Sequence, residues 1–109
     1  MRIWDIPPKQ LCRQHLLGEH RELHAIWSIL VNNKKGYSKH PETIRWKGKL
    51  NALYIRHEQQ VKEMKTRGFN HKSPLDKTNA IGIDKQYEYV DSIEKQIRIL
   101  KNKRCECKL

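Results

Sequence analysis

Ionisable side chains are concentrated in one short stretch near the start of the chain, residues 14–23, which read QHLLGEHREL. If this stretch is helical, His15, Gly18 and Glu22 fall on one side of the helix, because successive residues are about 100° apart. His15 lies two turns before Glu22, so both side chains can point into one site. The pattern indicates a candidate site with an imidazole and a carboxylate, and it does not by itself select a reaction.

Ordinary structural roles explain the same residues. A glycine inside a helix costs roughly 0.5–1 kcal/mol relative to alanine, so Gly18 indicates that something approaches the backbone closely, and close helix packing satisfies that need. Glu22 can be an exposed carboxylate that pairs with a nearby Arg or His. His15 can face solvent or pair within the helix. The spacing alone leaves these alternatives open.

Apolar residues recur with helical spacing in three segments that must position this site. We predict helices over about 9–31 and 41–67, and a third from an Asp84 cap to the C-terminal tail, with irregular structure over 69–83. Gly68 follows Lys65 and Arg67, a typical helix ending. Strand-like alternation is absent.

The predicted fold class is therefore all-α. Residues 1–109 are expected to form a single compact domain of three main helices, with an extended N-terminal segment packed against them. This segment ends at Pro7-Pro8. Residues 103–109 are predicted to be a flexible basic tail.

The charge of the chain restricts its partners. A formal net charge of +11 over 109 residues favours a polyanion, with nucleic acid first and a membrane surface as the rival. No apolar run has the length of a spanning helix and no secretory pattern is present, so we expect no membrane partner and a cytoplasmic protein, associated with the nucleoid when bound to DNA.

Three cysteines, Cys12, Cys105 and Cys107, form neither an even disulfide framework nor the paired spacing of a zinc site. The two tail thiols can bind a soft metal or respond to redox state. Our interpretation is that they are incidental thiols on the tail.

Three motifs together resemble the pyrimidine-dimer DNA glycosylase family, typified by the phage endonuclease V. They are MRI at residues 1–3, QHLLGEHREL at 14–23 and KTRGFN at 65–70. The resemblance implies a small all-helical, monomeric enzyme that acts on cyclobutane pyrimidine dimers in UV-damaged duplex DNA. It implies a glycosylase with abasic-site lyase activity that needs neither metal nor small-molecule cofactor.

The resemblance also implies the catalytic groups. The family uses its N-terminal α-amine as nucleophile on the sugar C1′ and a glutamate on the first helix, which Glu22 matches through the string Arg21-Glu22-Leu23. The phage-type enzyme loses its initiator methionine, and in register its exposed amine aligns with Met1. A large second residue, Arg2, should block methionine removal, so Met1 itself is expected to supply the amine.

The chemistry of an α-amine supports such a nucleophile independently. Its pKa of about 7.7–8.0, against about 10.4 for lysine, leaves a neutral fraction roughly several hundredfold larger at neutral pH. Glu22 can stabilise the positive charge that develops on the sugar and imine, and assist proton movements during elimination.

DNA contacts are assigned partly by resemblance and partly by charge. Arg2, Gln14, His15 and Arg21 match family positions near DNA, and the two arginines are expected to hold phosphates. A family arginine four residues beyond Arg21 is replaced by Ala25, for which His24 is a possible substitute. Cations of the third helix and tail form a second candidate phosphate-binding surface, although such a run is often only a solvated face: Lys95, Arg98, Lys101, Lys103 and Arg104.

Recognition is expected to kink the duplex and extrude a base. We predict that Gly18 makes room for the extended N-terminus or for the DNA backbone one turn from Glu22. The resemblance is thin after about Leu75, and the family's aromatic-rich C-terminal segment is missing, which leaves lesion preference open.

Three alternatives remain at this point. The same chemistry can act on another lesion, such as a ring-opened or alkylated purine. A non-catalytic basic helical DNA-binding protein accounts for charge and helicity alone. A helical adaptor for an acidic protein accounts for the charge but leaves the N-terminal motif unexplained.

Overall fold

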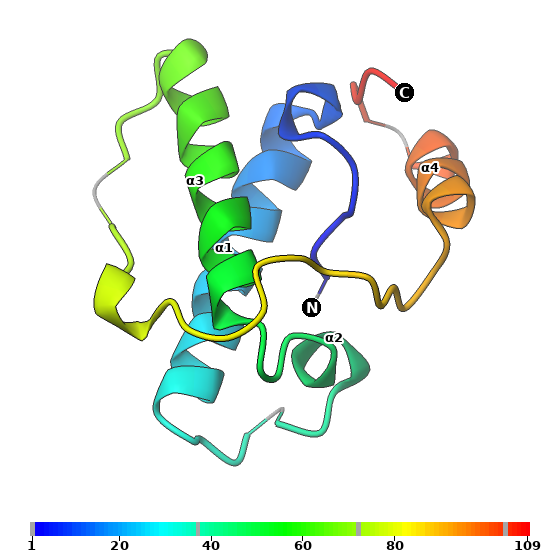
Figure 1. Ribbon diagram of the computed structural model, residues 1–109. Helices are drawn as coiled ribbons and strands as arrows, with labels where there is room; N and C mark the ends of the chain where they lie inside the picture. Colours follow the sequence, from blue (N-terminus) through cyan, green and yellow to red (C-terminus); the bar gives the residue numbers. More distant parts are fainter. Residues whose placement is uncertain (1, 37, 72, 104) are drawn as a thin grey trace.

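In the described part of the chain, the fold consists of four α-helices and two short 3₁₀ turns (Figure 1). The computed structural model describes residues 2–36, 38–71, 73–103 and 105–109. The elements, in chain order, are η1 (Pro8–Gln10), α1 (Arg13–Val31), α2 (Pro41–Ile44), α3 (Leu50–Thr66), η2 (Lys77–Asn79) and α4 (Ile93–Asn102). Because the described residues contain no strand beyond one isolated bridge, the all-α prediction is confirmed.

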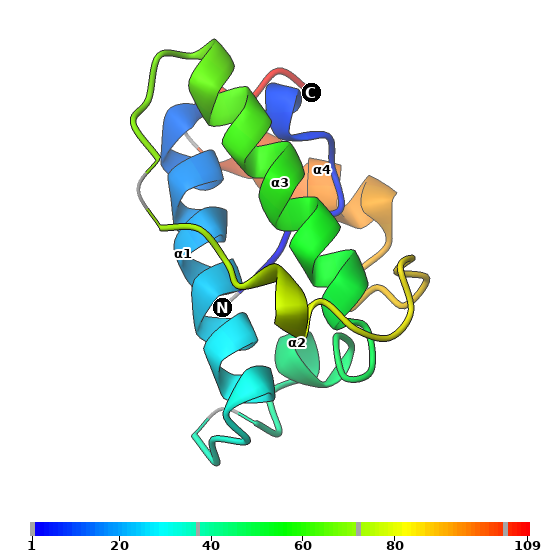
Figure 2. The ribbon, with the colours of Figure 1, turned by 60° about the vertical axis from the view of Figure 1, so that its left-hand side comes forward.

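The two longest helices, α1 and α3, lie side by side and build most of the core (Figures 1 and 2). The apolar stripe of α1 faces α3, and Leu16, Leu23 and Ile26 are fully buried on it. Burial of each such side chain contributes about 1.5–3 kcal/mol, which far exceeds the differences in helix propensity along the segment. Packing of this stripe therefore decides how α1 is oriented.

The N-terminal segment packs against these helices, as predicted. Ile6 and Leu11 share an apolar cluster with Leu16 of α1, Met64 of α3 and Leu100 of α4. The segment therefore contacts all three long helices. The radius of gyration, 13.6 Å, is close to the value of about 13 Å expected for a compact chain of 100 residues.

The predicted second helix, 41–67, is wrong in its continuity, because it is divided into α2 and α3. Gly48 has a φ of +73°, a left-handed conformation that interrupts a helix. Its carbonyl accepts a hydrogen bond from Ile83 N at 3.0 Å. A Cβ at Gly82 would lie 2.2 Å from Gly48 O, so this close approach requires glycine at 82. Carbonyls of residues 81 and 83 then accept from two amides in the first turn of α3.

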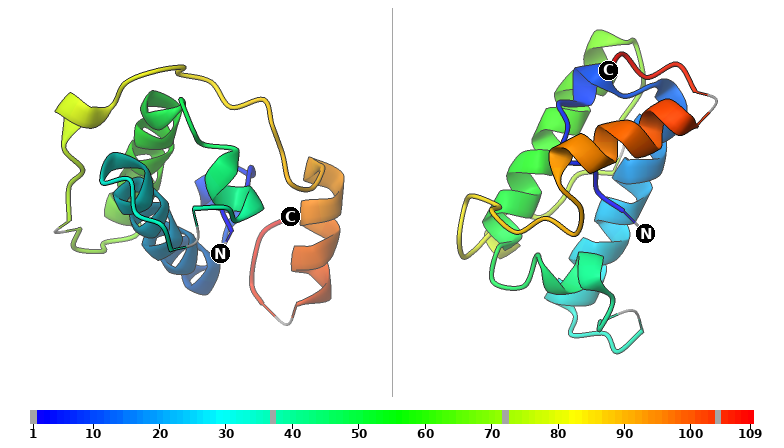
Figure 3. Two further views of the ribbon diagram at one scale, coloured as in Figure 1. Left: turned by 90° about the horizontal axis from the view of Figure 1, so that it is seen from below. Right: turned by 90° about the vertical axis from the view of Figure 1, so that its right-hand side faces the viewer.

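The third helix also starts later than predicted. Asp84 does not cap it; α4 begins at Ile93, and the Ser92 side chain accepts from Lys95 N at 3.2 Å. The segment before α4 is instead held by Arg45, whose carbonyl accepts from the Gln86 side chain at 2.7 Å. A distant partner thus overrides the local helix signal. Figure 3 shows this connection wrapping around the molecule to reach α4.

The ends of the first two predicted helices are closer to expectation. The first begins at Arg13 instead of about residue 9, because Pro8–Gln10 form the 3₁₀ turn η1. Gly68 ends α3 with a φ of +80°, and Phe69 N donates to Met64 O at 2.8 Å, which satisfies a carbonyl of the last turn. None of the helices in the described ranges has the length and apolar character needed to cross a membrane.

Candidate active site

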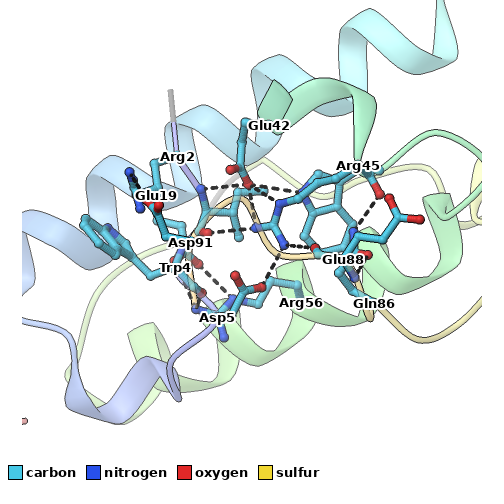
Figure 4. A network of polar contacts seen from close by, with 12 residues as sticks. Arg2, Trp4, Asp5, Glu19, Glu42, Arg45, Arg56, Gln86, Glu88 and Asp91 are labelled. Carbon is cyan, nitrogen blue, oxygen red and sulfur yellow. Dashed lines mark hydrogen bonds and ion pairs between the residues drawn. The ribbon is translucent and has the colours of Figure 1, made fainter. Parts of the chain in front are cut away.

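The N-terminal segment has no strand partner among the described residues, and buried side chains satisfy its amides instead (Figure 4). Three consecutive N–H groups donate to three different helices: Ile3 N to Glu42 Oε1 of α2 (3.2 Å), Trp4 N to Glu19 Oε1 of α1 (2.7 Å) and Asp5 N to Gln96 Oε1 of α4 (2.8 Å). Because each acceptor comes from a separate element, residues 3–5 are held in one position relative to the whole fold.

Arg45 fixes the same segment from its carbonyl side. Its Nη2 donates to Ile3 O at 2.9 Å, while its guanidinium also contacts Glu42 at 2.6 Å and Asp5 at 3.0 Å. Burial alone would lower the pKa of Arg45, but the two carboxylates raise it above its usual value. The guanidinium is only 4% exposed, so it is a buried cation whose charge is matched by neighbouring anions.

Glu19 has the equivalent role on α1. Its carboxylate is paired with Arg56 at 2.9 Å, accepts from Trp4 N, and accepts a short hydrogen bond from Gln60 Nε2. Arg56 Nη2 also donates to Trp4 O at 2.6 Å. Burial raises the pKa of Glu19, and these donors oppose that shift by favouring the carboxylate. Donors from Trp4 N, Arg56 and Gln60 thus occupy the Glu19 carboxylate, and Trp4 N and Arg56 link it to the N-terminal segment.

Glu22, one turn further along α1, has a different environment. It lines an open groove of about 610 Å³ together with Ala25, Ser28, Ile29, Lys34, Gly36 and His40. Within the ranges that the structure describes, its carboxylate has no hydrogen-bond or ion-pair partner. The carboxylate is therefore available to an incoming ligand.

The anchored N-terminal segment and this groove are neighbours. Ile3 belongs to the same core cluster as Leu23, the residue after Glu22. Glu42, which accepts from Ile3 N, donates its own amide to the His40 side chain, and His40 lines the groove. The predicted nucleophile Met1 lies outside the described residues, so its position relative to Glu22 stays a prediction.

The predicted DNA contacts on the N-terminal side have different surroundings. Arg2 is paired with Asp91 at 2.9 Å and stacks on Trp4, with its Cζ 4.8 Å from the ring centre. Gln14 and Arg21 are exposed. Arg21 lines a second groove, of about 640 Å³, together with Phe69 and other residues of the KTRGFN region.

His15 is not brought to the groove of Glu22. Its Nδ1 lies 3.1 Å from the Cys12 thiol and 3.4 Å from the Cys107 thiol, and its ring packs edge-on against Trp4. None of these three neighbours lines that groove. A DNA contact by His15 stays a prediction.

The cations predicted on the third helix, Lys95, Arg98 and Lys101, are exposed on α4. Lys95 pairs with Asp91 at 3.1 Å, so part of its charge is neutralised within the protein. Arg98 and Lys101 have no ion-pair partner among the described residues. Their assignment to DNA stays a prediction.

Gly18 has open space beside it. A Cβ added there would meet no described atom within 4 Å apart from its own helix backbone and chain neighbours. Close packing against another described part of the protein therefore does not explain why residue 18 is glycine. The N-terminal segment, as described from Arg2 onward, does not lie against Gly18, so that alternative of the prediction is wrong; room for a DNA backbone stays a prediction.

Sequence reasoning missed the buried groups that anchor the N-terminal segment: Glu19, Glu42, Arg45, Arg56 and Gln96. A signal existed for Glu19, which lies three residues after Leu16 and four before Leu23, on the apolar side of α1. A carboxylate on an apolar stripe indicates a buried partner. No comparable local signal identifies its partner, because Arg56 is 37 residues away.

Fold and site together define a small, all-α, strongly basic protein whose N-terminal segment is fixed next to a groove with an unpaired carboxylate. A family model described as pyrimidine dimer DNA glycosylase matches residues 1–77, and the chain belongs to this family. Searches of curated proteins and of solved structures gave no match. The matched residues contain α1, α2, α3 and the anchored segment, whereas α4 and the tail lie beyond them.

Family membership makes this protein a DNA repair glycosylase that binds damaged DNA. It also accounts for the large positive charge, because neutralising phosphates provides much of the affinity of such proteins.

Proposed function

We propose that this protein excises cyclobutane pyrimidine dimers from duplex DNA and then cleaves the abasic strand, with the Met1 α-amine as nucleophile and Glu22 as the catalytic carboxylate. The observation that carries the proposal is the anchoring of residues 3–5 by side chains of α1, α2 and α4. With Met1 as the nucleophile, the α-amine is separated from Ile3 by two residues, which span at most about 7 Å. The anchor therefore restricts where the α-amine can lie relative to Glu22.

The reaction has two parts. The neutral α-amine nitrogen attacks C1′ of the damaged nucleotide, a C1′–N bond forms, and the glycosidic bond breaks with its electron pair leaving on the base. Opening of the sugar ring gives a protonated imine. Loss of a proton from C2′ then allows the C3′–O bond to break, and the 3′ phosphate leaves as the β-elimination product.

Glu22 is suited to assist both parts. A carboxylate without an internal partner can stabilise the positive charge of the sugar and the imine, because its lone pairs are not engaged elsewhere. It can also accept a proton during ring opening or elimination. Lys34 and His40 line the same groove and provide positive or polar groups for a phosphate.

Borohydride trapping tests the proposal, because reduction converts the imine into a stable protein–DNA adduct. We expect an adduct with dimer-containing and abasic duplexes, and a strongly reduced yield for Glu22→Gln. Glu94→Gln, which removes an exposed carboxylate of α4, is the matched control and should trap normally. A folded, DNA-binding wild-type protein that forms no adduct would show that the protein acts without an imine.

The nucleophile needs its own test. A protein with a removable N-terminal extension should form no adduct until a protease exposes Met1 as the first residue. Adducts formed equally well before and after cleavage would assign the reaction to a lysine. Another outcome is that the protein forms adducts with abasic or ring-opened purine duplexes and none with a dimer-containing duplex. That result would support the imine mechanism and would show that the pyrimidine dimer is not the substrate.

A further inference from the structure

Histidines and cysteines are gathered in two places in this protein. The chain has six histidines and three cysteines, and all except His40 belong to two groups whose ligand atoms lie within 4.8 Å of one another. The four-histidine cluster consists of His20, His24, His57 and His71, and the Cys/His cluster consists of Cys12, His15, Cys105 and Cys107. Neither group belongs to the groove of Glu22.

The four-histidine cluster joins two helices and a loop. His20 and His24 are four residues apart on α1 and so share one face of that helix. His57 lies on α3 and is 1% exposed, and His71 lies in the loop that follows Gly68. The three other histidines are only partly buried, so an ion can reach the cluster.

The ring nitrogens converge at distances that suit a metal ion. Nε2 of His24 lies 3.1 Å from Nε2 of His20 and 3.3 Å from Nε2 of His57. Nε2 of His71 lies 3.1 Å from Nε2 of His20. In a tetrahedral site with Zn–N bonds of about 2.0–2.1 Å, ligand nitrogens are separated by about 3.3–3.4 Å. The observed spacing is close to this edge length.

Outer hydrogen bonds orient two of the rings toward the same point. Gln60 donates its amide Nε2 to Glu19, so its Oε1 faces His20 Nδ1, at 2.7 Å. His20 must therefore carry its proton on Nδ1 and direct a lone pair from Nε2 into the cluster. Glu58 Oε1, 2.9 Å from His57 Nδ1, sets the same tautomer on α3. A carboxylate or carbonyl oxygen on the distal nitrogen is typical of metal-binding histidines.

Burial disfavours the charged form of three of these imidazoles. Burial lowers the pKa of His20 to about 4 and lowers the pKa of His24 and His71. Lone pairs of His20 and His57 point into the same space, and the Nε2 atoms of His24 and His71 adjoin it. A cation at the centre satisfies all four nitrogens at once.

We propose that His20, His24, His57 and His71 bind one Zn²⁺ ion through their Nε2 atoms. Four protein ligands fill a tetrahedral shell, so the ion is structural and no catalytic step passes through it. The site does not depend on the proposed reaction. Through Gln60 and Glu19 it is connected to Trp4 N, so the ion reinforces the anchor of the N-terminal segment.

The test is the zinc content of the full chain, purified from zinc-supplemented medium without a polyhistidine tag. We expect His71→Ala and His24→Ala each to remove one equivalent of zinc relative to wild type. His71→Ala alters a loop and keeps the core intact, so loss of zinc from it is not a consequence of misfolding. His40→Asn, which changes the one histidine outside both clusters and keeps a helix-capping side chain, is the matched control.

Cobalt substitution gives a second measurement. Co²⁺ at this site should show the strong visible bands of tetrahedral cobalt, and they should persist in a protein whose three cysteines are serine. Unchanged zinc content in both histidine variants would overturn the site. Bound iron, nickel or copper, lost in the same variants, would overturn the assignment of zinc.

A different observation carries a second proposal, at the Cys/His cluster. The tail returns to the start of α1, where Lys108 N donates to Gln10 O at 2.7 Å and Cys12 N donates to the Cys107 sulfur at 3.1 Å. His15 Nδ1 is 3.1 Å from one thiol and 3.4 Å from another. In a tetrahedral zinc site, sulfur and nitrogen ligands are separated by about 3.5–3.6 Å.

We infer that Cys12, His15, Cys105 and Cys107 bind a second structural Zn²⁺ ion that fastens the tail to α1. Three thiolates and one imidazole form one of the common closed zinc shells. Cys105→Ser and Cys107→Ser should each remove one equivalent of zinc and leave the equivalent of the four-histidine cluster in place. Co²⁺ should add near-ultraviolet sulfur-to-metal bands that vanish in these variants.

The competing outcome is a disulfide. An intact mass lower by two hydrogens under non-reducing conditions, with no zinc lost in the cysteine variants, would overturn this second site. If only His24→Ala and His71→Ala lose zinc, the site at the Cys/His cluster is also overturned, whereas the site at the four-histidine cluster is supported.

Discussion

Glu19 and Glu22 lie three residues apart on α1, yet the two carboxylates have opposite surroundings. Glu19 is 2% exposed and engaged by Arg56, Gln60 and Trp4 N. Glu22 lines an open groove and has no partner among the residues that the structure describes. The Glu19 carboxylate is engaged within the protein, whereas the Glu22 carboxylate is unpaired among the described residues.

The contrast between the two glutamates shows how a small protein combines a rigid site with an unpaired carboxylate. Buried charges that are fully hydrogen-bonded fix a segment in place, because breaking them would leave an unpaired buried charge. An unpaired carboxylate contributes little to stability but is free for chemistry. Substitutions at the two positions should therefore separate stability from activity.

The largest effect is expected for Glu19→Ala. Removing this carboxylate leaves the Arg56 guanidinium without its partner and Trp4 N without an acceptor, so the free energy of unfolding should fall by about 3–5 kcal/mol. Urea denaturation followed by circular dichroism measures it. Glu94→Ala, which removes an exposed carboxylate of α4, should cost far less. A loss below about 1 kcal/mol for Glu19→Ala would mean that the network is not an anchor.

Glu22→Gln should show the reverse pattern. We expect the single-turnover rate of strand cleavage to fall about 10²–10³-fold, the range for removal of one electrostatic stabiliser. Stability should stay within about 0.5 kcal/mol of wild type, since no internal contact is lost. A variant that cleaves at the wild-type rate would exclude Glu22 from catalysis.

A smaller effect is expected for Arg21→Ala, on the exposed side of α1. If Arg21 holds one phosphate, the variant should bind all duplexes more weakly, and the slope of log affinity against log salt should decrease by about 1. Lys85→Ala, an exposed cation distant in sequence from the site, is the control. An unchanged slope would place Arg21 outside the DNA interface.

The smallest effect is expected for Gly18→Ala. Because a Cβ meets no described atom within 4 Å, alanine should stabilise the protein by about 0.5–1 kcal/mol. If the DNA backbone approaches Gly18, the same variant should bind duplex DNA less tightly. Thermal unfolding measures the change in stability, and a titration with duplex DNA on the same sample measures the change in affinity. If the variant and the wild type bind DNA equally well, Gly18 has no role in DNA recognition.

Local patterns in the sequence were sufficient for part of this structure. The spacing of Leu16, Leu23 and Ile26 predicts α1 and its buried face, and Gly68 after Lys65 predicts the end of α3. Helical periodicity and left-handed glycines are properties of neighbouring residues, so they can be read without a fold.

Local patterns failed where a distant partner decides the conformation. The second helix is interrupted at Gly48 because residues 81–83 pack against it, and α4 starts late because the preceding segment is bonded to Arg45. The same limit applies to the two metal-ligand clusters. In the sequence, His20, His57 and His71 are far apart and show no metal-binding spacing. Their ring nitrogens come together only when α1 packs on α3.

The sequence by itself determined the charge, the helical class and the string around Glu22, because composition, spacing and motif are properties of the chain. Only the tertiary structure decided which glutamate is buried and which histidines converge. Those outcomes depend on partners such as Arg56 and Gln60, which lie about 40 residues from Glu19 in the chain. These partners come close to Glu19 only when the apolar faces of α1 and α3 pack together and exclude water.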